Sequence, residues 1–125
     1  MSSRVYECNI SKEQELKKLL EYDPYLDSKL TEDDLKKLRE DESANVIFAR
    51  QDYVLKEGAA LDLDREKCYL FLKATDEFLD KAEKKLKASI EGIKRVDPEM
   101  ESKIITSIEN ERSKAEQGFG FIFGG

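Results

Sequence analysis

The fold is decided by residues 44–74, ANVIFARQDYVLKEGAALDLDREKCYLFLKA, in which short apolar runs alternate with polar breaks. The apolar runs are residues 46–48, 53–55, 61–63 and 69–72. Aromatic and β-branched residues in such runs favour strands, and charged or glycine-containing breaks between them are typical of turns. The stretch therefore predicts a meander of three or four antiparallel strands.

The segments before and after this stretch predict helices around one further strand. Residues 4–10 alternate in the period of a half-buried strand. Ser11, with Gln14 three residues on, has the spacing of a capping box at a helix start. Leucines at helical spacing after it predict a short helix that ends before Pro24, because the residue before a proline avoids the α region. Thr31, followed by three acidic residues, has the features of an N-cap of a second helix.

Two more helices are predicted after the meander. Thr75 can cap a helix of about 18 to 20 residues, estimated from the run of apolar residues at helical spacing before Gly92. Asp97 and Pro98 are typical of the start of a helix, and the apolar stripe that follows predicts that this helix ends at Gly118. The fold class is thus α+β: a single antiparallel sheet, with an N-terminal strand and a four-strand meander, covered by helices. The residues expected to be buried in its core are Phe48, Leu70, Leu72, Leu79 and Leu86.

The order of these elements over roughly residues 4–95 resembles the TATA-binding-protein-like architecture. In that architecture one strand and a helix precede four antiparallel strands and a closing helix on one face of a curved sheet. The phenylalanines that insert into DNA, and the basic concave face of that family, have no counterpart here. A ferredoxin-like or helix-grip arrangement accommodates the same elements, and no function follows from the fold alone.

Composition points to one charged, intracellular domain. The chain has 125 residues, enough for a single domain, residues 1–125, with its own core. Charged residues make up 40% of it, with 22 basic and 28 acidic, a near balance that is typical of a solvated folded surface. Abundant Lys and Glu resemble a thermophile's composition. With no apolar run of about 20 residues and no signal peptide before Arg4, we expect a cytoplasmic protein without membrane contact.

No residue pattern identifies a reaction, a metal site or a cofactor. The chain has no histidine, which removes the commonest metal ligand and the usual general base. Cys8 and Cys68 are far apart and form no CxxC motif, so buried free thiols are favoured over a disulfide. We therefore expect no catalytic, cofactor-binding or metal-binding residues, and we favour a protein that is not an enzyme.

Two charged patterns are candidate sites with an ordinary alternative. Asp62 and Asp64 would face one side of a strand about 7 Å apart, which suits a cation or simply a solvated face. Lys81, Lys84 and Lys85 would share one helix face and could contact phosphate or RNA, although a solvated face explains them as well. The net charge of −6 makes a nucleic-acid partner unlikely.

The C-terminal segment, residues 119–125, is the strongest candidate for an interaction site. Its apolar residues are Phe119, Phe121, Ile122 and Phe123. Burying a phenylalanine stabilises by roughly 1.5 to 3 kcal/mol, so the segment is expected to dock. Its alternation suits an added edge strand, either on its own sheet or on that of a second copy.

The favoured function is accordingly a non-enzymatic interaction or assembly module, with a homo-oligomer as the possible partner. One alternative is a small-molecule-binding protein or enzyme with a pocket between the sheet and the long helix. The other is a nucleic-acid accessory protein that uses the basic helix.

Overall fold

The computed structural model describes residues 1–41 and 46–124, and side chains as far as Ala115 except those of residues 42–45. The helices and strands, in chain order, are β1 (Ser2–Asn9), α1 (Glu13–Glu21), α2 (Glu32–Glu40), β2 (Asp52–Glu57), β3 (Lys67–Ala74), α3 (Asp76–Ser89), β4 (Lys94–Arg95) and α4 (Pro98–Gly124). The strands form one sheet in the order β2-β3-β1-β4, and every neighbouring pair is antiparallel. The predicted α+β class with a single antiparallel sheet is confirmed.

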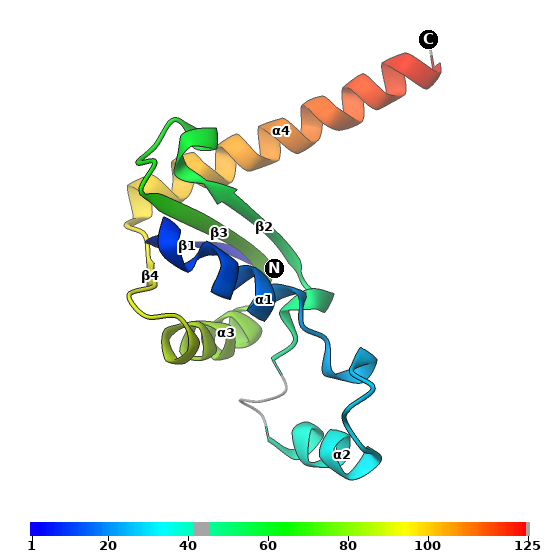
Figure 1. Ribbon diagram of the computed structural model, residues 1–125. Helices are drawn as coiled ribbons and strands as arrows, with labels where there is room; N and C mark the ends of the chain where they lie inside the picture. The colour runs from blue at the N-terminus through cyan, green and yellow to red at the C-terminus, as the bar shows by residue number, and fades with distance from the viewer. Residues whose placement is uncertain (42–45, 125) are drawn as a thin grey trace.

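The sheet is the middle of three layers. Figure 1 shows α1 and α3 on one face and α4 crossing the other. The α2 segment lies to one side of this body, joined to α1 by a connection that contains the 3-10 turn Pro24–Leu26. No helix within the described residues has the length and apolar character needed to cross a membrane.

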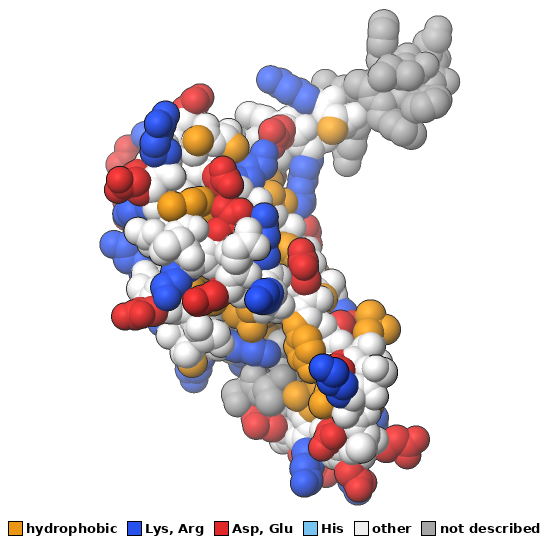
Figure 2. Space-filling model, in the orientation of Figure 1, with side chains coloured by type: hydrophobic (Ala, Val, Ile, Leu, Met, Phe, Trp, Pro, Cys, Tyr) orange, Lys and Arg blue, Asp and Glu red, His pale blue; other side chains and the backbone are white. Residues whose placement is uncertain are grey.

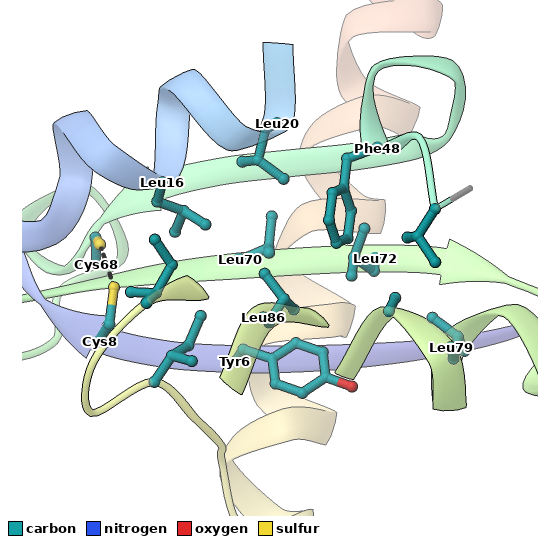
Figure 3. Packing of buried hydrophobic residues seen from close by; sticks show 14 of the residues in the cluster. Tyr6, Cys8, Leu16, Leu20, Phe48, Cys68, Leu70, Leu72, Leu79 and Leu86 are labelled. Atoms are coloured by element: carbon teal, nitrogen blue, oxygen red, sulfur yellow. Dashed lines mark hydrogen bonds between the residues drawn. The ribbon is translucent and has the colours of Figure 1, made fainter. Parts of the chain in front are cut away.

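Two hydrophobic cores lie on the two faces of the sheet, one under α1 and α3 and one under α4. β3 supplies residues to both because successive side chains of a strand point to opposite faces. Leu70 and Leu72 pack under α1 and α3, whereas Tyr69 and Phe71 pack under α4. Figure 3 shows the first core, in which Leu16 and Leu20 of α1 approach Leu70. The residues that the sequence places in the core are all at most 1% exposed: Phe48, Leu70, Leu72, Leu79 and Leu86.

The four-strand meander is wrong in two of its four strands. Residues 46–48 lead into a 3-10 turn, Phe48–Arg50, whose Phe48 is buried against the α1 side of the sheet. Residues 61–63 belong to a compact loop after the 3-10 turn Gly58–Leu61, in which Leu63 N–H donates to Gly58 O at 2.8 Å. The TATA-binding-protein-like order, which needs four strands here, is therefore not observed.

Glycine at position 58 makes this loop possible. A Cβ added at Gly58 would lie 1.8 Å from the backbone oxygen of Asp64, so the chain passes too close for any side chain. The loop also turns through Asp62 in the left-handed region, at φ 57°. Such a path cannot pair as a strand, although Leu61 and Leu63 still pack against the α4-side core.

The predicted helix starts are confirmed at three of four positions. Thr31 accepts from Asp34 N–H at 3.2 Å, Thr75 from Phe78 N–H at 3.2 Å and Asp97 from Met100 N–H at 2.9 Å. Ser11 is not the cap of α1, because it lies in the 3-10 turn Ile10–Lys12 before that helix. α3 has 14 residues rather than the expected 18 to 20, and the short strand β4 follows it.

α4 continues to Gly124, so the predicted end at Gly118 and the predicted strand over residues 119–125 are wrong. The alternation of phenylalanine and glycine suggested a strand, but a helix that is already formed extends at little cost per residue. The side chains of Phe119, Phe121, Ile122 and Phe123 lie outside the described ones.

Replacing Leu70 with alanine should destabilise the protein by about 2 to 5 kcal/mol, through lost burial and the cavity left in the core. Leu26→Ala is the matched control, because Leu26 is 82% exposed whereas Leu70 is 0% exposed. Urea unfolding followed by circular dichroism measures both. A loss below 1 kcal/mol for Leu70→Ala would contradict the packing of β3.

Candidate interaction surface

α4 is fixed to the sheet at its first turns by a buried carboxylate. Glu101 Oε2 accepts from Val5 N–H of β1 at 3.0 Å and from Arg95 Nε at 2.8 Å, and its Oε1 accepts from Arg95 Nη2 at 2.7 Å. The ladder between β4 and β1 includes only Tyr6 and Glu7 of β1. The carboxylate therefore accepts the hydrogen bond of Val5 N–H, the backbone donor just beyond this ladder.

The hydrogen bonds determine the ionisation of Glu101. Burial by itself would raise the pKa of this carboxyl, but the hydrogen bonds from Arg95 and Val5 outweigh burial and hold the pKa below its ordinary value. Glu101 is therefore a charged group that ties α4, β1 and β4 together.

From this point α4 crosses the sheet towards β2. Ile104 and Ile108 are buried in the core under α4, which they share with Phe71 of β3. One turn later the Arg112 guanidinium lies 5.3 Å from the centre of the Phe71 ring. The helix thus passes over β1, then β3, and reaches the edge strand of the sheet.

Two ion pairs join α4 to β2 at this edge. Arg112 donates two hydrogen bonds to the carboxylate of Asp52, at 2.8 and 3.1 Å, and Lys56 pairs with Glu111. The hydrogen bonds from Arg112 hold the pKa of Asp52 below its ordinary value. Asp52 and Lys56 therefore point to the α4 face of the sheet, although they stand at opposite ends of β2.

β2 is an edge strand with one side open. It pairs with β3 along Asp52–Glu57, and no described residue pairs with its other side. The side chains of Tyr53, Val54 and Leu55 are only partly buried. A hollow of about 170 Å³ lies along this edge and is lined by Lys17, Leu20, Glu21, Tyr53 and Leu55.

α4 extends beyond the edge of the sheet. Residues 113–115 are exposed, and the helix continues from there to Gly124. Figure 1 shows this end of α4 standing clear of the three-layer body. Figure 2 shows acidic and basic side chains interspersed over the visible face of the body.

The basic helix of the sequence is α3, and the structure gives its lysines ordinary partners. Lys85 Nζ donates to Val46 O at 2.8 Å and lies 5.8 Å from the Phe48 ring, and burial lowers its pKa. Lys81 pairs with Glu77 at 3.6 Å, and Lys84 is exposed. Because α3 contains four acidic residues and four lysines, its helix surface has no net charge.

The acidic pair, Asp62 and Asp64, does not lie on a strand as expected. Asp62 ends a 3-10 turn in the left-handed region, and Asp64 accepts from Glu66 N–H at 2.9 Å in the loop. The two residues lie on no common strand, so the predicted common face is wrong. Within the described part of the chain, no group of three or more Cys, Asp or Glu residues is placed to hold a metal ion.

Cys8 and Cys68 are brought together, as direct partners across β1 and β3. Both are buried and free, as the sequence predicted for them, with their sulfurs 3.3 Å apart. Figure 3 shows this pair at one end of the core. Tyr6 lies in the same core; its hydroxyl has no hydrogen-bond partner among the described residues, and burial raises the pKa of the phenol to about 12.

The residues that hold α4 on the sheet, and so direct its projecting end, were not singled out from the sequence. They are Asp52, Lys56, Glu101, Glu111 and Arg112. One signal was available: Glu101 and Arg112 continue the helical spacing of Ile104 and Ile108, so two charged residues stand on an otherwise apolar stripe. The lysines of α3 and the acidic pair lie elsewhere.

Comparison with known proteins assigns no family. The chain matches no protein-family model, no curated protein and no solved structure.

Replacing Glu101 with glutamine should destabilise the protein at pH 7 by about 1.5 to 3 kcal/mol, the usual value for a hydrogen bond to a charged group. The folded pKa of Glu101 is depressed, so its contribution is present above the unfolded value of about 4.3 and is lost as the pH falls through the folded pKa. Urea unfolding at several pH values should therefore show the two proteins converging below about pH 4.

Glu99→Gln is the matched control on the same turn of α4. Its side chain is 83% exposed and pairs with Lys103 at 3.7 Å, so its loss should change stability by less than about 0.5 kcal/mol. An equal effect of the two substitutions would contradict a specific role of Glu101.

Titration with random single-stranded and double-stranded oligonucleotides should show no binding tighter than about 10 µM at physiological salt, because the net charge of −6 opposes phosphate contacts. Fluorescence anisotropy measures this. A sub-micromolar affinity that falls steeply with salt and is lost in Lys84→Glu/Lys85→Glu would establish the basic helix as a nucleic-acid site.

Proposed function

We propose that this protein is a non-enzymatic assembly module that associates with itself through the projecting end of α4. The observation that carries the proposal is the path of α4, which is fixed to the sheet from Glu101 to Arg112 and then leaves it. The residues after Arg112 comprise 113–124, twelve helical positions that pass beyond the edge of the sheet.

A helix in this position needs a partner. The end of α4 continues a helix that is already formed, but it has no sheet beneath it, and most helical stability in proteins comes from packing an apolar face. The sequence of the extension is apolar at its end, with Phe119, Phe121, Ile122 and Phe123 within five positions. Contact with another chain would bury these residues, at roughly 1.5 to 3 kcal/mol for each large side chain.

The order of elements supports a ferredoxin-like core for this module. Apart from α2, the chain runs β1-α1-β2-β3-α3-β4, which is the succession of the split β-α-β fold, with β1 and β3 in the centre of the sheet. In this interpretation α4 is an addition on the face that the two crossover helices leave open.

Packing of the described residues disfavours the two alternatives. The space between the sheet and α3, the helix that follows Thr75 and was proposed to border a ligand pocket, is occupied by a core that includes Leu70, Leu72 and Leu86. The helix proposed for nucleic acid has no net charge, and Lys85 is used inside the fold.

Light scattering should show that the full chain is a dimer and that a chain ending at Gly118 is a monomer, because the truncation removes the apolar end of α4. Lys114→Gln is the control, since Lys114 is an exposed residue of the same extension and its loss should leave the mass unchanged. Thermal unfolding of each protein should be recorded alongside.

Two results would contradict the proposal. A full chain that is monomeric up to about 100 µM would show that α4 does not mediate self-association at affinities usual for assembly. A dimeric mass that the truncation leaves unchanged would place the interface elsewhere.

A further inference from the structure

We infer that two copies associate by pairing their β2 edges antiparallel, with Val54 on the two-fold axis, so that the two sheets become one sheet of eight strands. The inference rests on the proposed self-association and specifies the surface and the register. An unpaired edge strand is a ready template for a strand of another chain. β2 is such an edge, and no described strand pairs with its outer side.

The two faces of β2 are chemically distinct. Tyr53 and Leu55 pack against the core under α1 and α3, whereas Val54 packs against the core under α4. Asp52 and Lys56 belong to the α4 face, where Arg112 and Glu111 hold them. The α4 face of β2 therefore presents an acidic residue, a valine and a lysine in this order: Asp52, Val54 and Lys56.

Symmetry limits the possible registers. Antiparallel pairing of identical edges places the two-fold axis perpendicular to the sheet, so each face of one copy continues into the same face of the other. Residues directly opposite each other share a face, which excludes registers with the axis between two residues. The axis must then pass beside Tyr53, Val54 or Leu55 for the strands to overlap over most of β2.

Only the register centred on Val54 pairs compatible side chains on both faces. It places Asp52 opposite Lys56 of the second copy, so two pairs of unlike charges form across the axis. It also places Tyr53 opposite Leu55 of the second copy on the other face. Opposite charges and aromatic–aliphatic pairs are the combinations that stabilise neighbouring strands.

The other two registers place apolar side chains opposite charged or polar ones. With the axis at Leu55, Val54 would lie opposite Lys56 and Tyr53 opposite Glu57. With the axis at Tyr53, Asp52 would lie opposite Val54, and Leu55 opposite Gln51. The β2 sequence is therefore complementary to itself in the Val54 register.

The path of α4 suits this arrangement. The helix reaches β2 at Glu111 and Arg112, and the twelve residues that follow span about 18 Å at 1.5 Å per residue. A second copy on the β2 edge would continue the sheet in the direction in which α4 projects in Figure 1. The extension, which lacks a sheet beneath it in one copy, would then lie on the α4 side of the combined sheet.

Cysteine cross-linking tests the register. Directly opposite residues have Cα atoms about 4.5 to 5.5 Å apart, within the range that a disulfide spans. Val54→Cys should therefore form a disulfide-linked dimer with oxidised glutathione on a non-reducing gel, at least tenfold more than Lys56→Cys. In the Lys56→Cys control the two thiols would be separated by about four residues of strand, or roughly 13 Å. Cys8 and Cys68 are buried and present in both proteins.

A mixture of two variants provides a second measurement that does not depend on the substitution at Val54. Tyr53→Cys mixed with Leu55→Cys should cross-link, because residue 53 of one copy lies opposite residue 55 of the other. Each variant alone should not cross-link, because its two cysteines would lie about two residues apart along the paired strands. Light scattering before oxidation confirms that each variant keeps the mass of the full chain.

The outcomes separate the inference from the proposed function. A full chain that is dimeric and loses its dimer on truncation, but in which neither Val54→Cys nor the mixture cross-links, would overturn the β2 pairing and leave self-association through α4 standing. A full chain that is monomeric would overturn both. Cross-linking of Val54→Cys and of the mixture, with the controls uncross-linked, would support the register.

Discussion

Burial of β3 on both faces is the constraint on which the rest of the structure depends. Leu70 and Leu72 need a helical layer on one side, and Tyr69 and Phe71 need one on the other. Neither layer suffices alone, because an uncovered face of the sheet would leave several large side chains in water at roughly 1.5 to 3 kcal/mol each. The crossover helices α1 and α3 cover the first face, and α4 exists in its observed place because the second face requires cover.

Apolar packing alone would allow α4 to slide or rotate on the sheet, and the polar contacts remove this freedom. Glu101 bonds a backbone donor of β1 and the side chain of Arg95, so it fixes the beginning of the helix. Asp52 and Lys56 fix the helix again at the far edge. A buried carboxylate is costly unless all its partners are present, which makes the position of α4 specific. The direction in which its end projects follows from these two fixed points.

The two edge strands of the sheet, β4 and β2, differ in length, and the proposed self-association uses the longer one. At β4 the ladder is short, and the Glu101 carboxylate rather than a backbone carbonyl accepts from Val5 N–H. At β2 the open side runs along six residues, with Asp52 and Lys56 on one face. Natural sheets protect edges by shortening or covering them. In the proposed dimer, the longer uncovered edge beside the projecting helix would offer the second copy both hydrogen-bonding groups and apolar surface.

The sequence by itself determined what depends on neighbouring residues. Thr31, Thr75 and Asp97 begin helices because a side chain bonds a backbone N–H three residues on, and the burial of Leu70 follows from its apolar run. Tertiary structure decided the rest. The alternating residues 61–63 do not form a strand, because the backbone at Asp64 folds back against Gly58 and places them in a loop. The ties from α4 to β1 and β2 join residues 55 or more positions apart. No local pattern encodes contacts over such sequence separations, since they arise only when both faces of one strand are covered.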